Sequence, residues 1–220
     1  MGRSEALVAR IARKEEYAGA CRIYLYNEVI VIARERKFTT DDLFRETGHV
    51  LLAQGYEGFT FSILAERLQV SRGALYKYYD NKDELISDFM IHEMDRFLAE
   101  LREIDNCPDF ESRFRYLLDL IFKRRTIHQL ISSVQQIPRS GNAKVKANLA
   151  RLDQLHLDMY ARLGSFVGQG RREGKLRSHL PDGLVLGFIF QSIMIPNHSG
   201  IPYEEWVAAI EDIIRHGIMA

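Results

Sequence analysis

Aromatic hydroxyls and cations are concentrated in one short stretch of this 220-residue sequence, residues 67–82. The stretch reads RLQVSRGALYKYYDNK, and its four cations and one acid leave a surplus of three positive charges in a chain whose formal net charge is zero. Lysine, arginine and tyrosine side chains bind phosphate oxygens, and the guanidinium fork of arginine fits the edge of a guanine. The stretch therefore predicts a local nucleic-acid contact, although the molecule as a whole has no charge to attract one.

Cap and turn residues predict two short helices here, in the pattern of a helix-turn-helix. Thr60 caps a first helix of about eight residues, a turn follows at residues 69–70, and Ser71 caps a second helix that runs through Tyr78. Leu75 lies on the inward face of the second helix. A plain helical hairpin with a hydrated, cation-rich face and core tyrosines is the alternative reading of the same spacing.

The outward face of the second helix carries the groups that could read a duplex groove. Arg72 is the candidate for a bidentate guanine contact, and Tyr76 and Tyr78 place a hydroxyl donor at the tip of a rigid ring. Gly73 and Ala74 permit close approach, and Ala74 could also meet a thymine methyl. We predict that tyrosine and lysine contacts fix the register on the backbone, whereas Arg72 reads a base.

The motif order in GYEGFTFSILAERLQVSRGALYKYYDNKDELI (residues 55–86) resembles the TetR/AcrR family of bacterial transcriptional regulators. The strong part of the resemblance covers residues 43–90. Leu75 and Tyr79 fall on its core positions. Tyr79 stands where phenylalanine is usual, so its extra hydroxyl must find a partner or water, and Gly48 stands where a larger apolar residue is usual, which predicts looser packing there. The resemblance implies DNA contact at nine positions: Thr60, Ser71, Arg72, Gly73, Ala74, Tyr76, Lys77, Tyr78 and Lys82.

Helical periodicity dominates the whole chain, which predicts an all-α fold. We expect an N-terminal three-helix helix-turn-helix DNA-binding domain over residues 39–88, followed by a helical-bundle ligand-binding and dimerisation domain over residues 89–220. Asp80 or Asn81 begins a helix that could run to about residue 104 and is shared by both domains. Further helices are predicted near 110–124, 126–137, 143–173, 181–195 and 203–218.

Residues 1–38 are predicted to form an N-terminal helical extension that the family lacks. Apolar residues recur at roughly helical spacing over 5–36, although residues 23–33 are rich in β-branched and aromatic side chains. Eight cations and five acids in residues 1–37 leave two readings open. In the first reading, the extension lies beside DNA. In the second, it packs against the body or a partner subunit, or stays poorly ordered.

The resemblance implies a homodimer that binds a palindromic, double-stranded operator through two reading heads about one DNA turn apart, roughly 34–36 Å. Helices near 182–195 and 203–218 would form the interface, or would merely close the core of one subunit. The expected interface residues are Leu184, Gly187, Phe188, Gln191, Trp206, Ile210, Ile213 and Ile214.

By the same resemblance, a small-molecule effector binds inside the C-terminal bundle and releases a repressor from DNA. The plausible lining residues are Phe89, Met90, Phe114, Phe122, Met159, Tyr160, Phe166, Phe188 and Phe190. Such a lining suits an apolar or aromatic effector, or a cation held over rings. The alternative is a DNA-bound adaptor whose bundle binds a protein partner instead of a small ligand.

Several other classes of function find no support in the sequence. The longest apolar run, residues 184–195, is interrupted by Gln191 and Ser192 and is too short to span a bilayer, so we expect a cytoplasmic protein without membrane association. No His lies four residues from another His or Cys, and Ser132 and Ser133 lack a nucleophile setting. We therefore expect no metal, no cofactor and no enzymatic activity.

Overall fold

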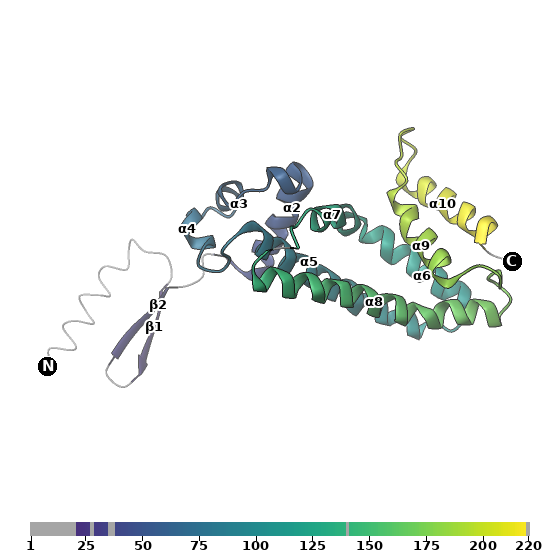
Figure 1. Ribbon diagram of the computed structural model, residues 1–220, viewed down its shortest axis with the longest axis horizontal. Coiled ribbons are helices and arrows are strands. Elements are labelled where there is room, and N and C mark those ends of the chain that lie inside the picture. The colour runs from purple at the N-terminus through teal and green to yellow at the C-terminus, as the bar shows by residue number, and fades with distance from the viewer. Residues whose placement is uncertain (1–20, 27–28, 35–37, 140, 219–220) are drawn as a thin grey trace. The chain divides into compact units, whose positions relative to one another are not determined.

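The computed structural model describes residues 21–26, 29–34, 38–139 and 141–218 (Figure 1). The chain divides into two compact units, one ending at Leu43 and the other beginning at Phe44. The first unit contains a hairpin, and the second contains the helices that carry the candidate site.

The first unit contains an antiparallel hairpin of β1 (Cys21–Tyr26) and β2 (Val29–Arg34), paired in register from Cys21 opposite Arg34 to Tyr26 opposite Val29. The predicted helical extension over residues 1–38 is therefore wrong for these two segments. The runs IYLY and VIVI are β-branched and aromatic, and such side chains pack better on a pleated strand than on a helix. Residues 1–20 of the expected extension lie outside the described residues.

Helix α2 (Thr40–Gly58) begins with a reciprocal cap. The amide of Asp42 donates to Thr39 Oγ1 at 3.0 Å, and the amide of Thr39 donates to Asp42 Oδ2 at 3.1 Å. Thr39 is thus the cap residue of α2. The helix is kinked at Gly55, where φ is +66°, a conformation that glycine adopts without strain.

Helices α3 (Phe61–Arg67) and α4 (Arg72–Leu75) follow as a short pair. Thr60 Oγ1 accepts from the amide of Ile63 at 3.3 Å, so the predicted cap of α3 is confirmed. Two details of α4 differ from expectation. Ser71 occupies its cap position without a side-chain cap bond, and the helix ends at Leu75, with residues 76–78 in a turn that is closed by the Tyr78 and Tyr79 amides on the Leu75 carbonyl.

Helix α5 (Lys82–Leu101) begins at Asn81, whose Oδ1 accepts from the Glu84 amide at 2.9 Å. It passes into the 3-10 turn η2 (Arg102–Asn106), after which Pro108 and the cap residue Asp109 separate it from α6 (Phe110–Lys123). Asp109 and Ser112 form a capping box there. The predicted long helix from about residue 82, and its break before residue 110, are both confirmed.

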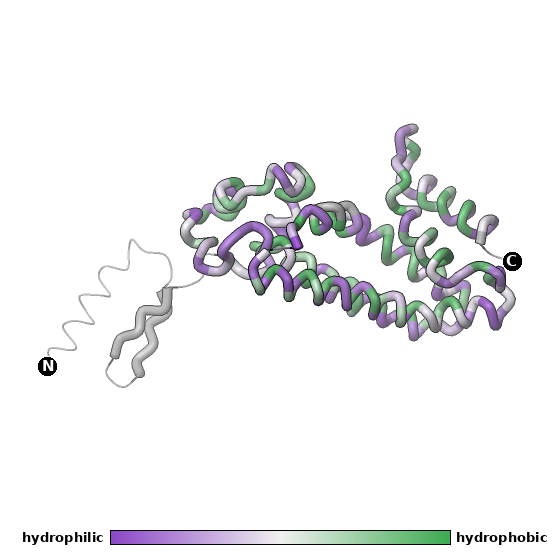
Figure 2. The backbone as a smooth tube through the Cα atoms, viewed as in Figure 1, coloured by the Kyte–Doolittle hydropathy of each residue, from purple (hydrophilic) through white to green (hydrophobic). Residues whose placement is uncertain are grey.

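The remaining helices lie close to their predicted ranges. They are α7 (Arg125–Gln135), the 30-residue α8 (Ala143–Arg172), α9 (Asp182–Gln191) with the 3-10 turn η3 (Ser192–Met194), and α10 (Tyr203–Ile218). In Figure 1, α8 lies beside α5 along much of its length. Figure 2 shows hydrophilic and hydrophobic residues alternating along α8, as expected of a helix with one buried face.

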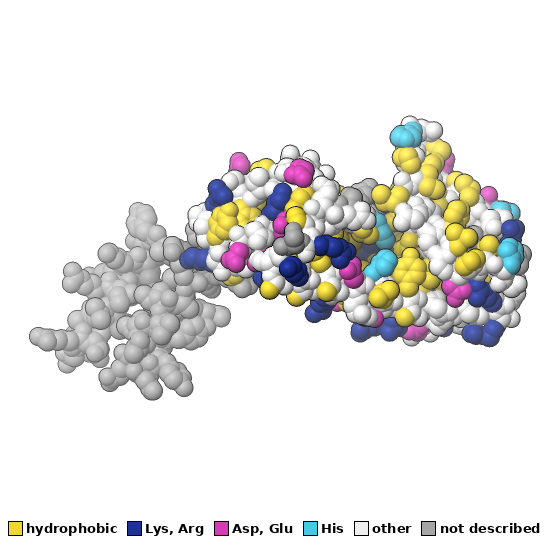
Figure 3. All heavy atoms as spheres, viewed as in Figure 1, with side chains coloured by type: hydrophobic (Ala, Val, Ile, Leu, Met, Phe, Trp, Pro, Cys, Tyr) yellow, Lys and Arg dark blue, Asp and Glu magenta, His cyan; other side chains and the backbone are white. Residues whose placement is uncertain are grey.

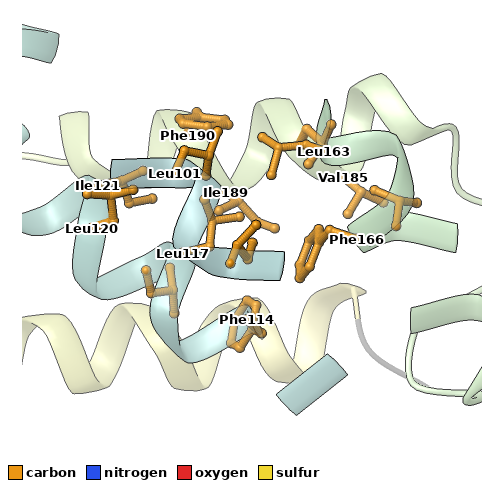
Figure 4. Packing of buried hydrophobic residues seen from close by; sticks show 14 of the residues in the cluster. Leu101, Phe114, Leu117, Leu120, Ile121, Leu163, Phe166, Val185, Ile189 and Phe190 are labelled. Carbon is orange, nitrogen blue, oxygen red and sulfur yellow. The ribbon is translucent and has the colours of Figure 1, made fainter. Parts of the chain in front are cut away.

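A cluster of buried side chains from α5, η2, α6, α8, α9 and α10 joins these helices into a bundle. Figure 4 shows Leu117 of α6, Leu163 and Phe166 of α8, and Val185 and Ile189 of α9 within it. All five are at most 1% exposed. The described helices from residue 40 onward therefore form an all-α fold, in which a helix-turn-helix precedes a helical bundle, as predicted. None of those helices is long and apolar enough to cross a bilayer.

Candidate functional site

The helix-turn-helix is closed by a tight turn over residues 68–70. Gln69 has φ +54°, the left-handed region that side-chain-bearing residues enter infrequently, and the Val70 amide donates to the Ala65 carbonyl at 2.9 Å. Ala65 and Leu75 are 4% and 1% exposed, so the small residue and the inward leucine occupy the buried side of the pair, as their positions in the sequence predict.

The opposite side of α4 and of the turn after it faces solvent. Arg72, Lys77, Tyr76 and Tyr78 are exposed, the two tyrosines by 43% and 38%. Thr60, Ser71 and Gly73 are exposed as well, whereas Ala74 is half-buried. The arginine, lysine and tyrosine side chains predicted for DNA contact are therefore available on one short segment. Exposed cations fit both readings, but the exposure of Tyr76 and Tyr78 disagrees with the plain hairpin, which places the tyrosines in the core.

Tyr76 connects this exposed face to the protein interior. Its hydroxyl accepts from Arg72 Nη2 at 2.7 Å, and the Arg72 guanidinium carbon lies 5.2 Å from the ring centroid. The same ring packs on Phe61 at 4.9 Å between centroids, and Phe61 is 5% exposed. Tyr76 therefore restrains the guanidinium that the sequence analysis assigns to base reading.

Lys82 differs from the other predicted contact residues because it is half-buried and bonded within the chain. Its Nζ donates to the Tyr56 carbonyl at 2.8 Å and lies 4.0 Å from the centroid of the Tyr56 ring. The Tyr56 hydroxyl donates to Asp83 at 2.7 Å, and burial together with this carboxylate raises the pKa of the Tyr56 phenol. Lys82 thus holds the chain just after the Gly55 kink, and its DNA contact stays a prediction.

Two departures from the family pattern have structural partners. Tyr79 is 8% exposed, as its core position implies, and its hydroxyl donates to Asp88 at 2.7 Å. The looser packing predicted at Gly48 is wrong: a Cβ there would lie 3.2 Å from Phe89 Cζ, so the glycine allows Phe89 to approach α2 closely.

The nine residues predicted to line an effector pocket mostly fill the core. Phe114, Phe122, Met159, Phe166 and Phe190 belong to the buried cluster, and Phe114 and Phe166 are fully buried. Tyr160 packs against that cluster and is half-buried, and Phe89 and Met90 are buried outside it. Phe188 is 43% exposed on α9, so its place in the predicted lining is corrected.

A cleft of about 590 Å³ lies elsewhere, between α5, η2 and α8. It is lined by Asp95, Leu98, Arg102, Asp105, Leu155, Asp158, Ala161, Arg162 and Ser165. None of the predicted pocket residues is among them, and Arg162 and Asp105 pair at 2.7 Å across it. Sequence reasoning missed this cleft because its lining is mostly charged, with two leucines and two small residues, and such a mixture looks like an ordinary solvated helix face.

An aromatic group that does include two predicted residues lies where four helices meet. The His128 ring of α7 lies 6.1 Å from Phe97 of α5 and 5.9 Å from Phe190 of α9, and Tyr160 of α8 lies 6.3 Å from Phe190. Burial, with a smaller contribution from His156, lowers the pKa of His128 to about 4, so this imidazole is neutral at physiological pH. Sequence reasoning did not select His128, although its position on an apolar helix face was visible.

The predicted dimer surface is only partly exposed. Leu184 and Ile213 are 59% and 58% exposed, and Phe188 and Gln191 are exposed beside them, whereas Gly187 and Trp206 are half-buried. Ile210 and Ile214 are 3% and 1% exposed and belong to the chain's own core, so their assignment to the interface is wrong. Of the three predicted isoleucines on α10, Ile210 and Ile214 thus pack into the core, and only Ile213 remains available to a second subunit.

The exposed apolar surface on α9 and α10 extends further than the sequence predicted. Met194 in η3, Ile195 directly after it and Tyr203 at the start of α10 are 50%, 46% and 46% exposed. Figure 3 shows hydrophobic side chains gathered over α9 and α10 in this view. We call Leu184, Phe188, Met194, Ile195, Tyr203 and Ile213 the α9–α10 apolar face.

Comparisons with known proteins agree with this geometry. Residues 39–88 match the profile of bacterial regulatory proteins of the tetR family. An uncharacterized HTH-type transcriptional regulator of Haemophilus influenzae is 27% identical over 78 residues, which are 35% of this chain and 42% of that protein. The chain therefore spans less than half the length of this curated relative.

Solved structures share the fold over most of the chain. The ketosteroid transcriptional regulator KstR2 of Mycobacterium tuberculosis aligns with a TM-score of 0.64 and 18% identity over 86% of this chain and 97% of its own. The transcriptional regulator FadR of Bacillus subtilis, solved in complex with stearoyl-CoA, aligns with a TM-score of 0.60 and 17% identity over 82% of this chain and 100% of its own. The match over residues 39–88 and the exposed side chains of Arg72, Tyr76 and Lys77 therefore identify a helix-turn-helix of the tetR type in this chain, and its described helices share the fold of these two regulators.

Proposed function

We propose that this protein is a homodimeric repressor that binds a palindromic DNA operator and is released from it by a small-molecule effector. The observation that carries the DNA-binding part is the exposed face of Arg72, Tyr76, Lys77 and Tyr78, in which Tyr76 holds the Arg72 guanidinium. Arg72 reads a base edge, and the lysine and tyrosine side chains contact phosphates. Thr60, Ser71, Gly73, Ala74 and Lys82 complete the proposed contact set.

Selection of bound fragments from the source genome tests the DNA-binding part. We expect the purified chain to retain a small set of related, palindromic fragments, with an affinity that falls as salt rises because each neutralised phosphate releases counterions. Lys77→Ala should weaken all fragments alike and make the salt dependence shallower by about one ion. Retention of no fragment at low salt would reject this function.

The homodimer is proposed to form through the α9–α10 apolar face. That face places leucine, phenylalanine, isoleucine and tyrosine side chains in solvent on the described surface of α9, α10 and the segment between them, and exposed apolar side chains gathered in this way are typical of an interaction site. A second copy related by a two-fold axis would cover it with the same face, and would hold two reading heads together.

The effector is proposed to enter the bundle beside the half-buried rings of His128 and Tyr160. Phe114 and Phe166 are fully buried, so binding there requires side chains to move apart, and only a ligand with much apolar surface would offset that movement. The shared fold with a ketosteroid regulator and with a regulator solved with stearoyl-CoA suggests the first test ligands. A true effector should raise the melting temperature and weaken operator binding together, because it prefers one of two states.

A further inference from the structure

Glu84, in the first turn of α5, is a buried carboxylate 4% exposed. Burial alone would disfavour its charge, so the charged form needs close partners. One partner comes from the end of residues 72–80, which we call the reading segment because they carry the proposed reading face of Arg72, Tyr76, Lys77 and Tyr78. The Asp80 amide donates to Glu84 Oε2 at 3.3 Å. Asp80 follows the exposed Tyr78 by two residues, so the carboxylate touches the segment that carries the reading face.

The other two partners come from the beginning of α8, about sixty residues away in the chain. Asn142 Nδ2 donates to Glu84 Oε1, and Lys144 Nζ lies 3.5 Å from Glu84 Oε2. Asn142 is also the cap of α8, since its Oδ1 accepts from the Val145 amide at 2.9 Å. The orientation of Asn142 is therefore fixed by α8 on one side and by Glu84 on the other.

Neighbouring contacts reinforce the same junction. Lys144 Nζ lies 4.8 Å from the centroid of the Tyr79 ring, and Asn148 Nδ2 of α8 donates to Ser87 Oγ of α5 at 3.0 Å. Ser87 is fully buried. Residues 79 and 80, which follow the reading face, are thus both held by side chains that belong to or touch the first turns of α8.

We propose that Glu84 is a positioning residue for operator recognition, which ties the residues after the reading face to the first turn of α8 through Asn142 and Lys144. If the start of α8 moves away, a buried carboxylate loses two of its partners, and this is unfavourable enough to move the reading segment as well. The proposal rests on the proposed function. In this proposal, a movement of the bundle reaches the reading face through the contacts of Glu84 with Asn142 and Lys144.

The dependence of binding affinity on the spacing between the two operator half-sites distinguishes a role of Glu84 in positioning the reading segment from a general loss of stability. Operators selected with the unaltered protein are lengthened or shortened by one base pair between half-sites, and affinities are compared at about pH 8. Asn142→Asp keeps an effective helix cap but places a second carboxylate against Glu84. We expect about tenfold weaker binding to the original operator and a smaller penalty for altered spacing.

The exchange variant Glu84→Gln with Asn142→Asp restores an amide–carboxylate pair with the two groups swapped. We expect it to recover most of the original affinity and spacing preference. Lys144→Met, at a side chain 46% exposed, provides a second variant that leaves the α8 cap intact and should relax spacing in the same direction. Arg151→Ala is the matched control, because it removes another α5–α8 ion pair, Arg151 with Asp95 at 2.9 Å, away from the reading segment.

The outcomes distinguish this inference from the function beneath it. If the unaltered protein selects no operator, the proposed function fails. If it selects one, and Asn142→Asp and Lys144→Met both keep the original spacing preference or the Arg151→Ala control relaxes it equally, only the positioning role of Glu84 is overturned.

Discussion

Tyr76 shows how a single residue serves the core and the reading face together. Its ring packs on Phe61, and its hydroxyl holds Arg72. A free arginine samples many rotamers, and holding one of them lowers the entropy lost on binding a base. The identity of residue 76 should therefore influence base reading, although its own predicted contact is with the backbone.

A double-mutant cycle on Arg72 and Tyr76 measures this coupling. Arg72→Ala should relax preference at one base pair by about 1–3 kcal/mol. Tyr76→Phe removes the 2.7 Å acceptor and should lower the same preference partially, and the two changes together should be less than additive. Arg72→Ala combined with Lys77→Ala is the control and should be additive. Competition binding on operator variants provides the measurement, and an additive Arg72/Tyr76 pair would contradict the coupling.

His128 gives the unfolding free energy a pH dependence whose sign follows from its pKa. The folded-state pKa of about 4 lies below the ordinary value of 6.5, so between these values the unfolded chain binds a proton that the folded chain does not. Stability therefore falls as pH drops through this window, by roughly 2 kcal/mol between about pH 7.5 and about pH 5. Above about pH 7.5, where the histidine is neutral in both states, the contribution is constant.

His128→Phe should remove this part of the pH dependence, because a phenylalanine between Phe97 and Phe190 keeps the ring packing without a titrating group. Urea unfolding of both proteins at the two pH values gives the difference. His216→Phe is the control, since that histidine is exposed near the end of α10. An unchanged slope in the His128 variant would contradict the neutral, buried imidazole.

At the scale of elements, the caps and breaks of the helices were readable from the sequence because they depend on local chemistry. Thr60, Asn81 and the break before residue 110 act through bonds to residues three positions away. The hairpin at residues 21–34 was not predicted, because an apolar run with β-branched residues fits either period and pairing decides between them. Helix α4 ends at Leu75 and not at Tyr78 as predicted, because tertiary contacts hold the residues after it: Tyr76 packs on Phe61, and Tyr79 donates to Asp88.

Two glycines of α8 test whether the local packing decides if a substitution by alanine stabilises or destabilises the protein. No described atom lies within 4 Å of a Cβ built on Gly164, so Gly164→Ala should stabilise the protein by about 0.5–1 kcal/mol through helix propensity. A Cβ on Gly170 would lie 2.6 Å from Phe110 Cε2 and 2.7 Å from Leu176 Cδ1.

Phe110 is fully buried and stacks on Phe166 at 4.9 Å between centroids, so it has little room to move. Gly170→Ala should therefore destabilise the protein by about 1–3 kcal/mol. Denaturant midpoints of the two variants should shift in opposite directions from that of the unaltered protein. Equal shifts would mean that propensity, not packing, sets the effect at both positions.

At the scale of the whole molecule, the α9–α10 apolar face should determine assembly. Ile213→Glu places a charge on a side chain that is 58% exposed on that face, so we expect monomers in sedimentation and loss of operator binding with the fold preserved. Leu157→Glu is the matched control: Leu157 is 61% exposed on α8, outside the face, and should leave the oligomer intact. An intact dimer in the Ile213 variant would reject this interface.

In the candidate site too, the features that depend on neighbouring residues were predictable, and those that depend on tertiary packing were not. The reading face was predictable because Arg72, Tyr76 and Lys77 lie within six residues and the surrounding motif is specific. The interface and pocket were not, since Ile210 and Ile213 look alike in the sequence and only the packing of α10 on the bundle buries one and exposes the other. The Glu84 junction was likewise invisible, because its partners are about sixty residues away.

Helix α5 is 20 residues long, which makes it a rod of about 30 Å between the buried core of the bundle and the Asn81 cap. A tilt of about 5° at one end displaces the other by nearly 3 Å, and two subunits tilting in opposite senses double that figure. Successive base pairs are separated by about 3.4 Å along the duplex axis. In the proposed dimer, a rearrangement too small to unfold any helix would therefore be enough to shift the two helix-turn-helix units out of phase with the proposed operator.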